Sequence, residues 1–507
     1  MRRRRFLAQR KIATKFHTKR VSKHALGDNM SSEKKLAETV NHTLKLRKNI
    51  RHVFWLYFVM FALLVGNIAY FVLAEAPAVV SNPFNHRMNA ATDALRGYII
   101  DSGGYALAHT LWCAEHGAGQ REYTLGRDFV HIVGFDGFGR SGVEARHNHS
   151  LQSISAEILQ RADNLLTGAP KRGNSIVLTA NADLQRLVVS ELNRSRGAIV
   201  VMEPSTGKVL AMASYPDFDP NQLAENWSAL IADSYNTPLL NRATQGLYPP
   251  GSVFKVITAS AAYRYLEDYA AFTHDCAGEA FFGGYRIQCY NATAHGTVDL
   301  ARAFAVSCNT YFAAVAMEVG SERMADVAER AGFGAGLGFD LVAVTSSFVL
   351  NEGSGTSEII QTAIGQGRTV VTPLHMAMIT SAVANGGMMM RPYVVDHALT
   401  GIGRQTAKTM PRAAGRVFEI SEAALLTEIM VQAVTDGSAH PVRIDGVAVA
   451  AKTGTAQNAA GDDHGWFVAF APADSPRVAV AIVLEHSGGP RRAMQMTRNI
   501  LLDILSD

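Results

Sequence analysis

Residues Tyr248–Lys255 read Tyr-Pro-Pro-Gly-Ser-Val-Phe-Lys. The Pro-Pro-Gly run predicts a turn, and the residues that follow, 252–266, have the pattern of a helix. Ser252 and Lys255 are three residues apart, so on a helix they lie on one face. A serine hydroxyl needs an adjacent base to become a nucleophile, and a lysine in a cleft can be that base because burial lowers its pKa. An N-cap serine beside a surface lysine has the same spacing, so this pair alone establishes no chemistry.

Two more polar motifs follow along the chain. Ser307-Cys308-Asn309 places a hydroxyl and an amide at alternate positions, so on a loop both can face one cleft. Lys452-Thr453-Gly454-Thr455 follows the apolar run Val447–Ala451, which predicts a strand. The lysine offers a positive charge, the threonines offer hydroxyls, and Gly454 lets a substrate backbone approach closely. Such a strand suits a peptide that binds as an added strand with its carboxylate held. Alone, this motif is also typical of a turn with an exposed lysine.

The remaining pattern predicts an α+β fold for residues 175–507. Apolar runs on either side of Pro204–Gly207 predict a β-hairpin. Helical patterns cover 299–318 and 373–385, strand-like runs surround and follow the Lys-Thr-Gly motif, and Met494–Leu505 predicts a closing helix. Strands first, helices in the middle and strands at the end predict an antiparallel sheet flanked by helices, with a helical subdomain.

The N-terminus predicts a membrane anchor. Residues 1–52 contain 16 Lys/Arg and 3 Asp/Glu, a net charge of +13, whereas residues 53–507 carry a net charge of −9. Val53–Ala74 contains no charged residue and is long enough to span a bilayer. It is too long for a cleaved signal peptide. The basic residues before it predict a cytoplasmic tail at 1–52, a signal anchor at 53–74 and a catalytic part outside. The run Arg2–Arg5 could also bind nucleic acid, but an anionic membrane surface is the preferred partner.

Residues 75–174 predict a small β-rich pedestal, because glycine-rich turns interrupt short apolar runs there. The chain has four cysteines. Cys276 and Cys289 are separated by several glycines, and the sequence leaves open whether they form a disulfide. The spacing of Cys and His residues predicts no zinc site.

Ser-x-x-Lys, Ser-x-Asn and Lys-Thr-Gly, in this order, form the signature of the serine penicillin-recognising enzymes. The chain resembles the class B penicillin-binding proteins, the monofunctional peptidoglycan D,D-transpeptidases, over about residues 175–490. Further stretches that resemble this family are Glu203–Met212, Tyr215–Asn221, Asn241-Arg242, His295-Gly296, Ala363–Gly367, Thr372–Leu374 and Gly465–Pro472. The pedestal resembles the family's more loosely, through Arg96-Gly97, Ile99, Leu107-Ala108, Gly142 and Glu144, with His147 where the family usually has Tyr.

The resemblance implies a role for each motif residue. Ser252 attacks the penultimate D-Ala carbonyl of a stem peptide that ends in D-Ala-D-Ala, and Lys255 takes its proton. Ser307 relays a proton to the departing D-Ala, and Asn309 positions the acyl amide. The terminal carboxylate is held by Lys452, Thr453 and Thr455, and the oxyanion by the backbone N–H groups of Ser252 and Thr455. No metal or organic cofactor is implied, β-lactams are expected to acylate the same serine, and a separate polytopic membrane glycosyltransferase is the expected partner.

Two other function classes share these motifs. A β-lactamase would clear its acyl-enzyme with water, but no Glu-x-x-Leu-Asn element follows Ser307. A β-lactam sensor or a non-catalytic scaffold would keep the fold, although the short basic tail carries no pattern of an effector domain. The roughly 100 residues between anchor and transpeptidase fold are few for a glycosyltransferase domain.

Overall fold

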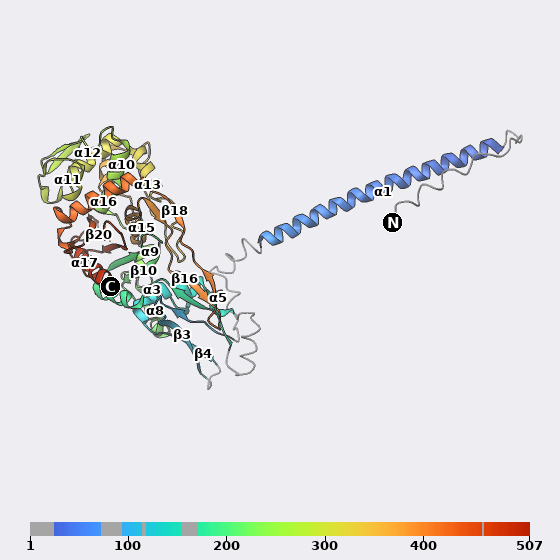
Figure 1. Ribbon diagram of the computed structural model, residues 1–507, viewed down its shortest axis with the longest axis horizontal. Helices are drawn as coiled ribbons and strands as arrows, with labels where there is room; N and C mark the ends of the chain where they lie inside the picture. Colours follow the sequence, from blue (N-terminus) through green and yellow to red (C-terminus); the bar gives the residue numbers. More distant parts are fainter. Residues whose placement is uncertain (1–24, 72–93, 114–117, 154–170, 459–460, 507) are drawn as a thin grey trace. The chain divides into compact units, whose positions relative to one another are not determined.

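The computed structural model describes residues 25–71, 94–113, 118–153, 171–458 and 461–506 (Figure 1). These residues belong to two units, Met1–Val79 and Val80–Asp507. The predictions for residues 1–24 of the tail, 72–74 of the anchor and 75–93 of the pedestal lie outside the described residues.

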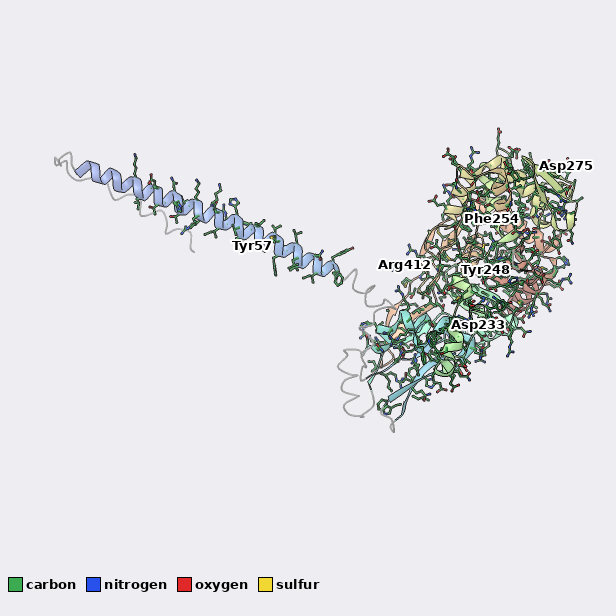
Figure 2. The ribbon with its side chains drawn as sticks, turned by 180° about the vertical axis from the view of Figure 1, so that it is seen from behind. Tyr57, Asp233, Tyr248, Phe254, Asp275 and Arg412 are labelled. Atoms are coloured by element: carbon green, nitrogen blue, oxygen red, sulfur yellow. The ribbon has the colours of Figure 1, made fainter. Side chains whose placement is uncertain are left out.

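The first unit contains one long helix, α1 (Ala25–Tyr70). Its part Leu36–Tyr70 is long and apolar enough to cross a membrane, judged by length and composition. Side chains along this part, such as Tyr57, point away from the helix into open space (Figure 2). The helix therefore contains residues 53–70 of the predicted apolar span and also continues back into the basic tail, for which no helix was predicted.

The second unit contains a six-stranded sheet at the end marked by β3 and β4 (Figure 1). Its strand order is β17-β16-β8-β2-β3-β4, and β8 runs parallel to β2 and antiparallel to β16. The strands are β2 (Ile99–Ile100), β3 (Ala106–Cys113), β4 (Ala118–Tyr123), β8 (Ser175–Leu178), β16 (Val395–Leu399) and β17 (Gln405–Lys408). Segments on both sides of the predicted boundary at residue 174 thus share one sheet, and the boundary itself stays a prediction.

A buried ion cluster joins this sheet to the helices beside it. Glu144, in α4 (Gly142–Arg146), is fully buried and pairs with Arg96 at 2.5 Å and with Arg121 at 2.7 Å. Burial raises the pKa of the Glu144 carboxyl, but the charges of Arg121 and Arg96 outweigh it, and the pKa is lowered. Because a buried charge needs partners, the three residues depend on one another for stability.

The core of the unit is a five-stranded antiparallel sheet with the order β10-β9-β21-β20-β19. The strands are β9 (Gly197–Met202), β10 (Val209–Tyr215), β19 (Ala450–Ala456), β20 (His464–Ala471) and β21 (Val478–Leu484). Every residue of β9, β20 and β21 is buried, so both faces of the sheet are covered. The helices that cover it are α7 (Ala182–Leu192), α15 (Pro373–Ala384), α16 (Ile420–Thr435) and α17 (Arg491–Ser506). The predicted antiparallel sheet, hairpin and closing helix are confirmed.

The helical subdomain lies at the far end of this unit from β3 and β4 (Figure 1). Its helices include α10 (Lys255–Tyr265), α11 (Leu300–Ala305), α12 (Asn309–Val319), α13 (Ser321–Arg330) and α14 (Thr356–Ala363). The helical pattern predicted over 299–318 forms two helices rather than one, because α11 ends before Ser307 and α12 begins after Cys308. Ser307 has a φ of 59°, a left-handed conformation that no α-helix can continue through.

Candidate active site

Ser252 lies in a short helical turn, Gly251–Phe254, that continues directly into α10 at Lys255. The turn is fastened to the sheet: the Trp466 indole donates to the Pro249 carbonyl at 2.9 Å. Gly251 has a φ of 56°, and a Cβ there would lie 2.4 Å from the Thr455 carbonyl oxygen. Only glycine therefore allows the serine turn to approach β19 this closely.

The Lys255 amine is fully buried and lies between the first and second motifs. Its Nζ donates to the Ser307 carbonyl at 2.8 Å, to Ser307 Oγ at 3.2 Å and to Asn309 Oδ1 at 2.7 Å. Burial lowers its pKa to about 8. Within the described residues Ser252 Oγ makes no hydrogen bond, and catalytic hydrogen bonds often tighten only when substrate binds. A lysine with this pKa can be uncharged near neutral pH and can accept a proton.

Lys452 reaches the same serine from the other side. Its Nζ donates to Ser307 Oγ at 2.9 Å and to the Thr453 carbonyl at 3.1 Å. Burial, and then the positive charge of Lys255, hold its pKa well below the usual value. Ser307 Oγ thus stands between two buried amines, and a proton can pass along this row.

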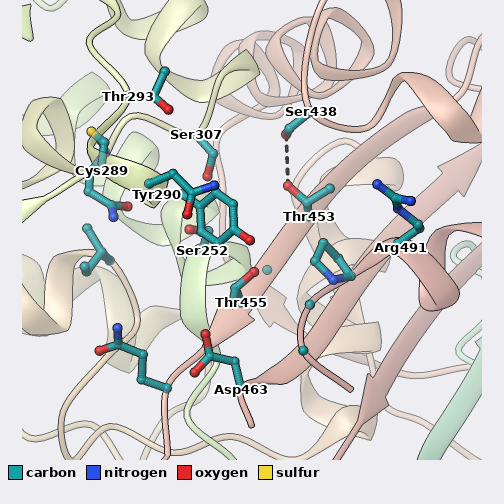
Figure 3. A pocket seen from close by; sticks show the side chains of 18 of the residues that line it. Ser252, Cys289, Tyr290, Thr293, Ser307, Ser438, Thr453, Thr455, Asp463 and Arg491 are labelled. Carbon is teal, nitrogen blue, oxygen red and sulfur yellow. Dashed lines mark hydrogen bonds between the residues drawn. The ribbon is translucent and has the colours of Figure 1, made fainter. Parts of the chain in front are cut away.

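All the predicted site residues except the two lysines line one cleft of about 1060 Å³. Ser252, Ser307, Thr453 and Thr455 surround it (Figure 3). Asn309 and Gly454 also line it, whereas Lys255 and Lys452 do not. We predicted that Lys452 would hold the substrate carboxylate directly. Its contacts with Ser307 and Thr453 favour an indirect role, in which its position supports the hydroxyls that face the cleft.

Gly454 is needed for a reason that the sequence pattern does not show. A Cβ at this position would lie 2.8 Å from Trp466 Cβ, 3.0 Å from Val253 Cγ1 and 3.2 Å from the Pro250 carbonyl oxygen. The predicted role was to let a substrate backbone approach. The structure adds a close approach between β19 and the serine turn itself.

Known proteins are similar to this chain in sequence and in fold. Residues 197–505 match the family model described as the penicillin binding protein transpeptidase domain. The chain belongs to the penicillin-binding protein transpeptidases. Residues 96–176 of this penicillin-binding protein match a second model, described as the penicillin binding protein A dimerisation domain.

Individual relatives agree with this assignment. The peptidoglycan D,D-transpeptidase PbpA of Mycolicibacterium smegmatis is 30% identical, over 87% of this chain and 94% of that protein. The peptidoglycan D,D-transpeptidase MrdA of Acinetobacter baumannii is 30% identical, over 75% of this chain and 65% of that protein. The ceftriaxone acyl-enzyme of Mycobacterium tuberculosis penicillin-binding protein A has a TM-score of 0.75 and 30% identity, over 81% of this chain and 98% of that one.

Among the residues of the cleft that were not predicted, two polar side chains contact β19. Ser438 Oγ lies 2.9 Å from Thr453 Oγ1 (Figure 3), and no motif in the sequence marks it. Gln366 donates to the Thr455 carbonyl at 3.2 Å and accepts from the Gln457 N–H at 3.2 Å. Gln366 belongs to the family-like stretch Ala363–Gly367, which was the available signal. Both residues hold β19 where its hydroxyls face the cleft.

A cluster of sulphur and nitrogen atoms beside the second motif was also missed. Cys276, Cys289, His295 and Cys308 place their ligand atoms within 4.8 Å of one another. Spacing rules look for short Cys or His pairs, and these four residues come together only through the fold. The possible disulfide is absent between the described cysteines: Cys276 and Cys289 are free thiols with Sγ atoms 3.6 Å apart.

Proposed function

We propose that this protein is a peptidoglycan D,D-transpeptidase of the class B type and that Ser252 is its acylated nucleophile. The observation that carries the proposal is the convergence of all three motifs on one cleft. Ser252, Ser307 and Thr455 face it, while Lys255 and Lys452 lie behind Ser307. Relatives at 30% identity are named D,D-transpeptidases or form β-lactam acyl-enzymes, which supports the same reaction.

Acylation begins with attack of Ser252 Oγ on the carbonyl carbon of the penultimate D-Ala. Neutral Lys255 accepts the serine proton, because burial keeps its pKa near 8. As the C–N bond breaks, Ser307 passes a proton to the nitrogen of the leaving D-Ala. Lys255 now carries the proton taken from Ser252 and returns it to Ser307 Oγ, while Lys452 holds the same oxygen in place by a hydrogen bond.

Substrate is held by the cleft edge of β19. The hydroxyls of Thr453 and Thr455 receive the terminal carboxylate, and Asn309 orients the amide of the acyl chain. The backbone N–H groups of Ser252 and Thr455 form the oxyanion hole, where fixed donors stabilise the developing charge. The amine of a neighbouring stem peptide then attacks the ester, which forms the cross-link and frees Ser252.

The anchor and pedestal complete the proposal. α1 crosses the cytoplasmic membrane once, with its basic N-terminus inside and the transpeptidase part outside. The chain divides into a tail at 1–52, an anchor at 53–74, a pedestal at 75–174 and a transpeptidase domain at 175–507. We further propose that it has no glycosyltransferase domain and works with a polytopic membrane glycosyltransferase. Co-purification that survives unchanged in pedestal variants would contradict contact through the pedestal.

The test is acylation of the full chain in detergent by a fluorescent penicillin, followed by intact mass over time. We expect a stable fluorescent adduct on the wild type and none on Ser252→Ala. Wild type treated first with unlabelled penicillin should take up no fluorescent label. Wild-type enzyme that has not met penicillin is expected to release D-Ala and form cross-linked dimers when glycan strands bearing D-Ala-D-Ala stem peptides are added. An adduct that disappears within seconds would favour a β-lactamase, and a folded wild type without any adduct would favour a scaffold.

A further inference from the structure

The active-site cleft offers few charged side chains for a site that binds a carboxylate. Lys255 and Lys452 are fully buried and lie behind its surface. Among the described residues, the lysines and arginines that line the cleft are Arg491 and Arg492, both in the first turn of α17. We propose that Arg491 binds the C-terminal carboxylate of the donor stem peptide directly, beside the threonine hydroxyls of β19. This assignment rests on the proposed function, because it concerns the substrate of that reaction.

The start of α17 is held against the strand that neighbours the Lys-Thr-Gly strand. Gly465, in β20, pairs with Thr455 of β19. A Cβ at Gly465 would overlap the Gly489 carbonyl oxygen, so the turn before α17 packs directly on β20. Arg491 follows Gly489 by two residues, and Figure 3 shows its side chain on the Thr453 side of the cleft. The backbone therefore brings this arginine to the edge where the substrate carboxylate is expected.

The two arginines of this turn have different surroundings. Arg492 donates to the carbonyl of Asn193, the residue that ends α7, at 3.4 Å. Arg491 is exposed, and among the described residues its guanidinium has no hydrogen-bond acceptor and no carboxylate partner. The acidic residue of the cleft, Asp463, lies at the Thr455 end of β19 in Figure 3, away from Arg491. The N–H donors of Arg491 are therefore available to a ligand.

The position of these charges is unfavourable for the helix itself. The N-terminus of a helix carries a partial positive charge, so acidic residues stabilise the first turn and cations destabilise it. The first turn of α17 contains Arg491 and Arg492 and no acidic residue. The two charges and the helix dipole add, which gives this corner of the cleft a positive potential that attracts anions. A carboxylate bound at Arg491 would relieve the repulsion.

A bound carboxylate needs a charged partner that the motif residues do not supply. The Lys452 amine donates to Ser307 Oγ at 2.9 Å and to the Thr453 carbonyl at 3.1 Å, and it does not line the cleft. A threonine hydroxyl has one hydrogen to donate, and Thr453 Oγ1 already lies 2.9 Å from Ser438 Oγ. A guanidinium can bind a carboxylate through two parallel N–H···O bonds, and such charged bonds are the stronger ones. Arg491 therefore supplies both the charge and the geometry that the hydroxyls lack.

The experiment compares two thioester substrates that differ in one charge. Both carry an acyl-D-Ala group on thioglycolic acid, whose carboxylate stands in for that of the terminal D-Ala, and in the second substrate this carboxylate is a methyl ester. Loss of thioester absorbance gives kcat/KM for the full chain in detergent. We expect Arg491→Ala to lower kcat/KM for the acid at least about tenfold and to change the value for the ester by less than about twofold. Arg491→Lys keeps the charge without the planar fork and should recover part of the loss.

The control is Arg498→Ala, which removes a charge from the same helix outside the cleft and should leave both values unchanged. Equal losses with the acid in Arg491→Ala and Arg492→Ala would overturn direct contact, because they would show an effect of overall charge. Equal losses with acid and ester would show a structural role and overturn it too.

The same data separate this assignment from the proposed function. A wild type that reacts with both thioesters, and whose preference for the acid persists in Arg491→Ala, would overturn the role of Arg491 and leave the transpeptidase proposal standing. A folded wild type that neither thioester nor penicillin acylates would overturn the proposed function and this assignment with it.

Discussion

The amine of Lys452 donates a hydrogen bond of 2.9 Å to the hydroxyl of Ser307, a residue 145 positions earlier in the chain. Ser307 Oγ also lies 3.2 Å from the Lys255 amine. The third motif therefore acts on the second, and through it on the first. This row of polar groups is the structural basis for the predictions on Ser307 and Lys255.

Ser307→Ala should interrupt the row while leaving the fold intact. Because proton transfer by one positioned group contributes about 10²- to 10⁴-fold, we expect the rate constant of penicillin acylation to fall at least about 100-fold. Ser234→Ala is the matched control, since Ser234-Tyr235-Asn236 has the same Ser-x-Asn pattern in an exposed segment. Stopped-flow measurements give the acylation rate constant of each variant, and melting curves show whether each variant keeps its fold. Equal acylation rates in Ser307→Ala and wild type would contradict the relay.

The pH dependence of the acylation rate should follow the deprotonation of the Lys255 amine. Burial lowers the Lys255 pKa to about 8, and only the uncharged amine can accept the Ser252 proton. The acylation rate should therefore rise as pH increases through about 8 and level off above it. Lys255→Arg stays charged at every accessible pH, so its rate should remain low throughout. A wild-type rate that falls over the same interval would exclude Lys255 as the base.

Gly454→Ala should damage both stability and acylation. The new methyl group would meet Trp466 Cβ at 2.8 Å and Val253 Cγ1 at 3.0 Å, and would push the serine turn away from β19. Overpacking of this kind costs about 1–3 kcal/mol. Gly336→Ala is the control, because a Cβ there meets nothing within 4 Å. Unfolding free energies and acylation rates should both be lower in Gly454→Ala than in Gly336→Ala. Equal values in the two variants would show that the contacts of the new methyl group with Trp466 and Val253 are easily relieved.

Glu144→Gln should destabilise the sheet that contains β3 and β4. The substitution leaves two buried arginines, Arg96 and Arg121, without their shared carboxylate, at a cost of about 3–5 kcal/mol. Glu279→Gln breaks the exposed pair with Arg286 and should cost at most about 1 kcal/mol. Unfolding curves at neutral pH compare the two. A Glu144→Gln chain as stable as wild type would show that the cluster contributes no net stability.

The same cluster predicts a direction for acid sensitivity. The folded-state pKa of Glu144 lies below its usual value. Its contribution to stability is therefore present at neutral pH and is lost as pH falls through the folded pKa. In Glu144→Gln this part of the acid dependence should be absent. Unfolding free energies of both chains, measured from pH 7 down to about pH 3, test the difference.

The sequence by itself determined the family and the three motifs of the site. Ser252 and Lys255 are linked by helix geometry over one turn, which is a local relationship. The apolar runs around Lys452 also specify a strand locally, and the hairpin at Pro204–Gly207 was predicted for the same reason. These elements depend on spacing and on side-chain type within a few residues.

Only the tertiary structure decided which distant atoms meet. In the folded chain Lys452 lies behind Ser307, and the expected helix is interrupted at Ser307. The absence of a side chain at Gly454 lets the serine turn pack against β19. The side chains of four residues far apart in the sequence form one cluster: Cys276, Cys289, His295 and Cys308. Each of these results depends on the packing of segments that are far apart in the chain. Local spacing contains no information about such contacts, because they form only when the sheet and the helical subdomain pack together around the same loop.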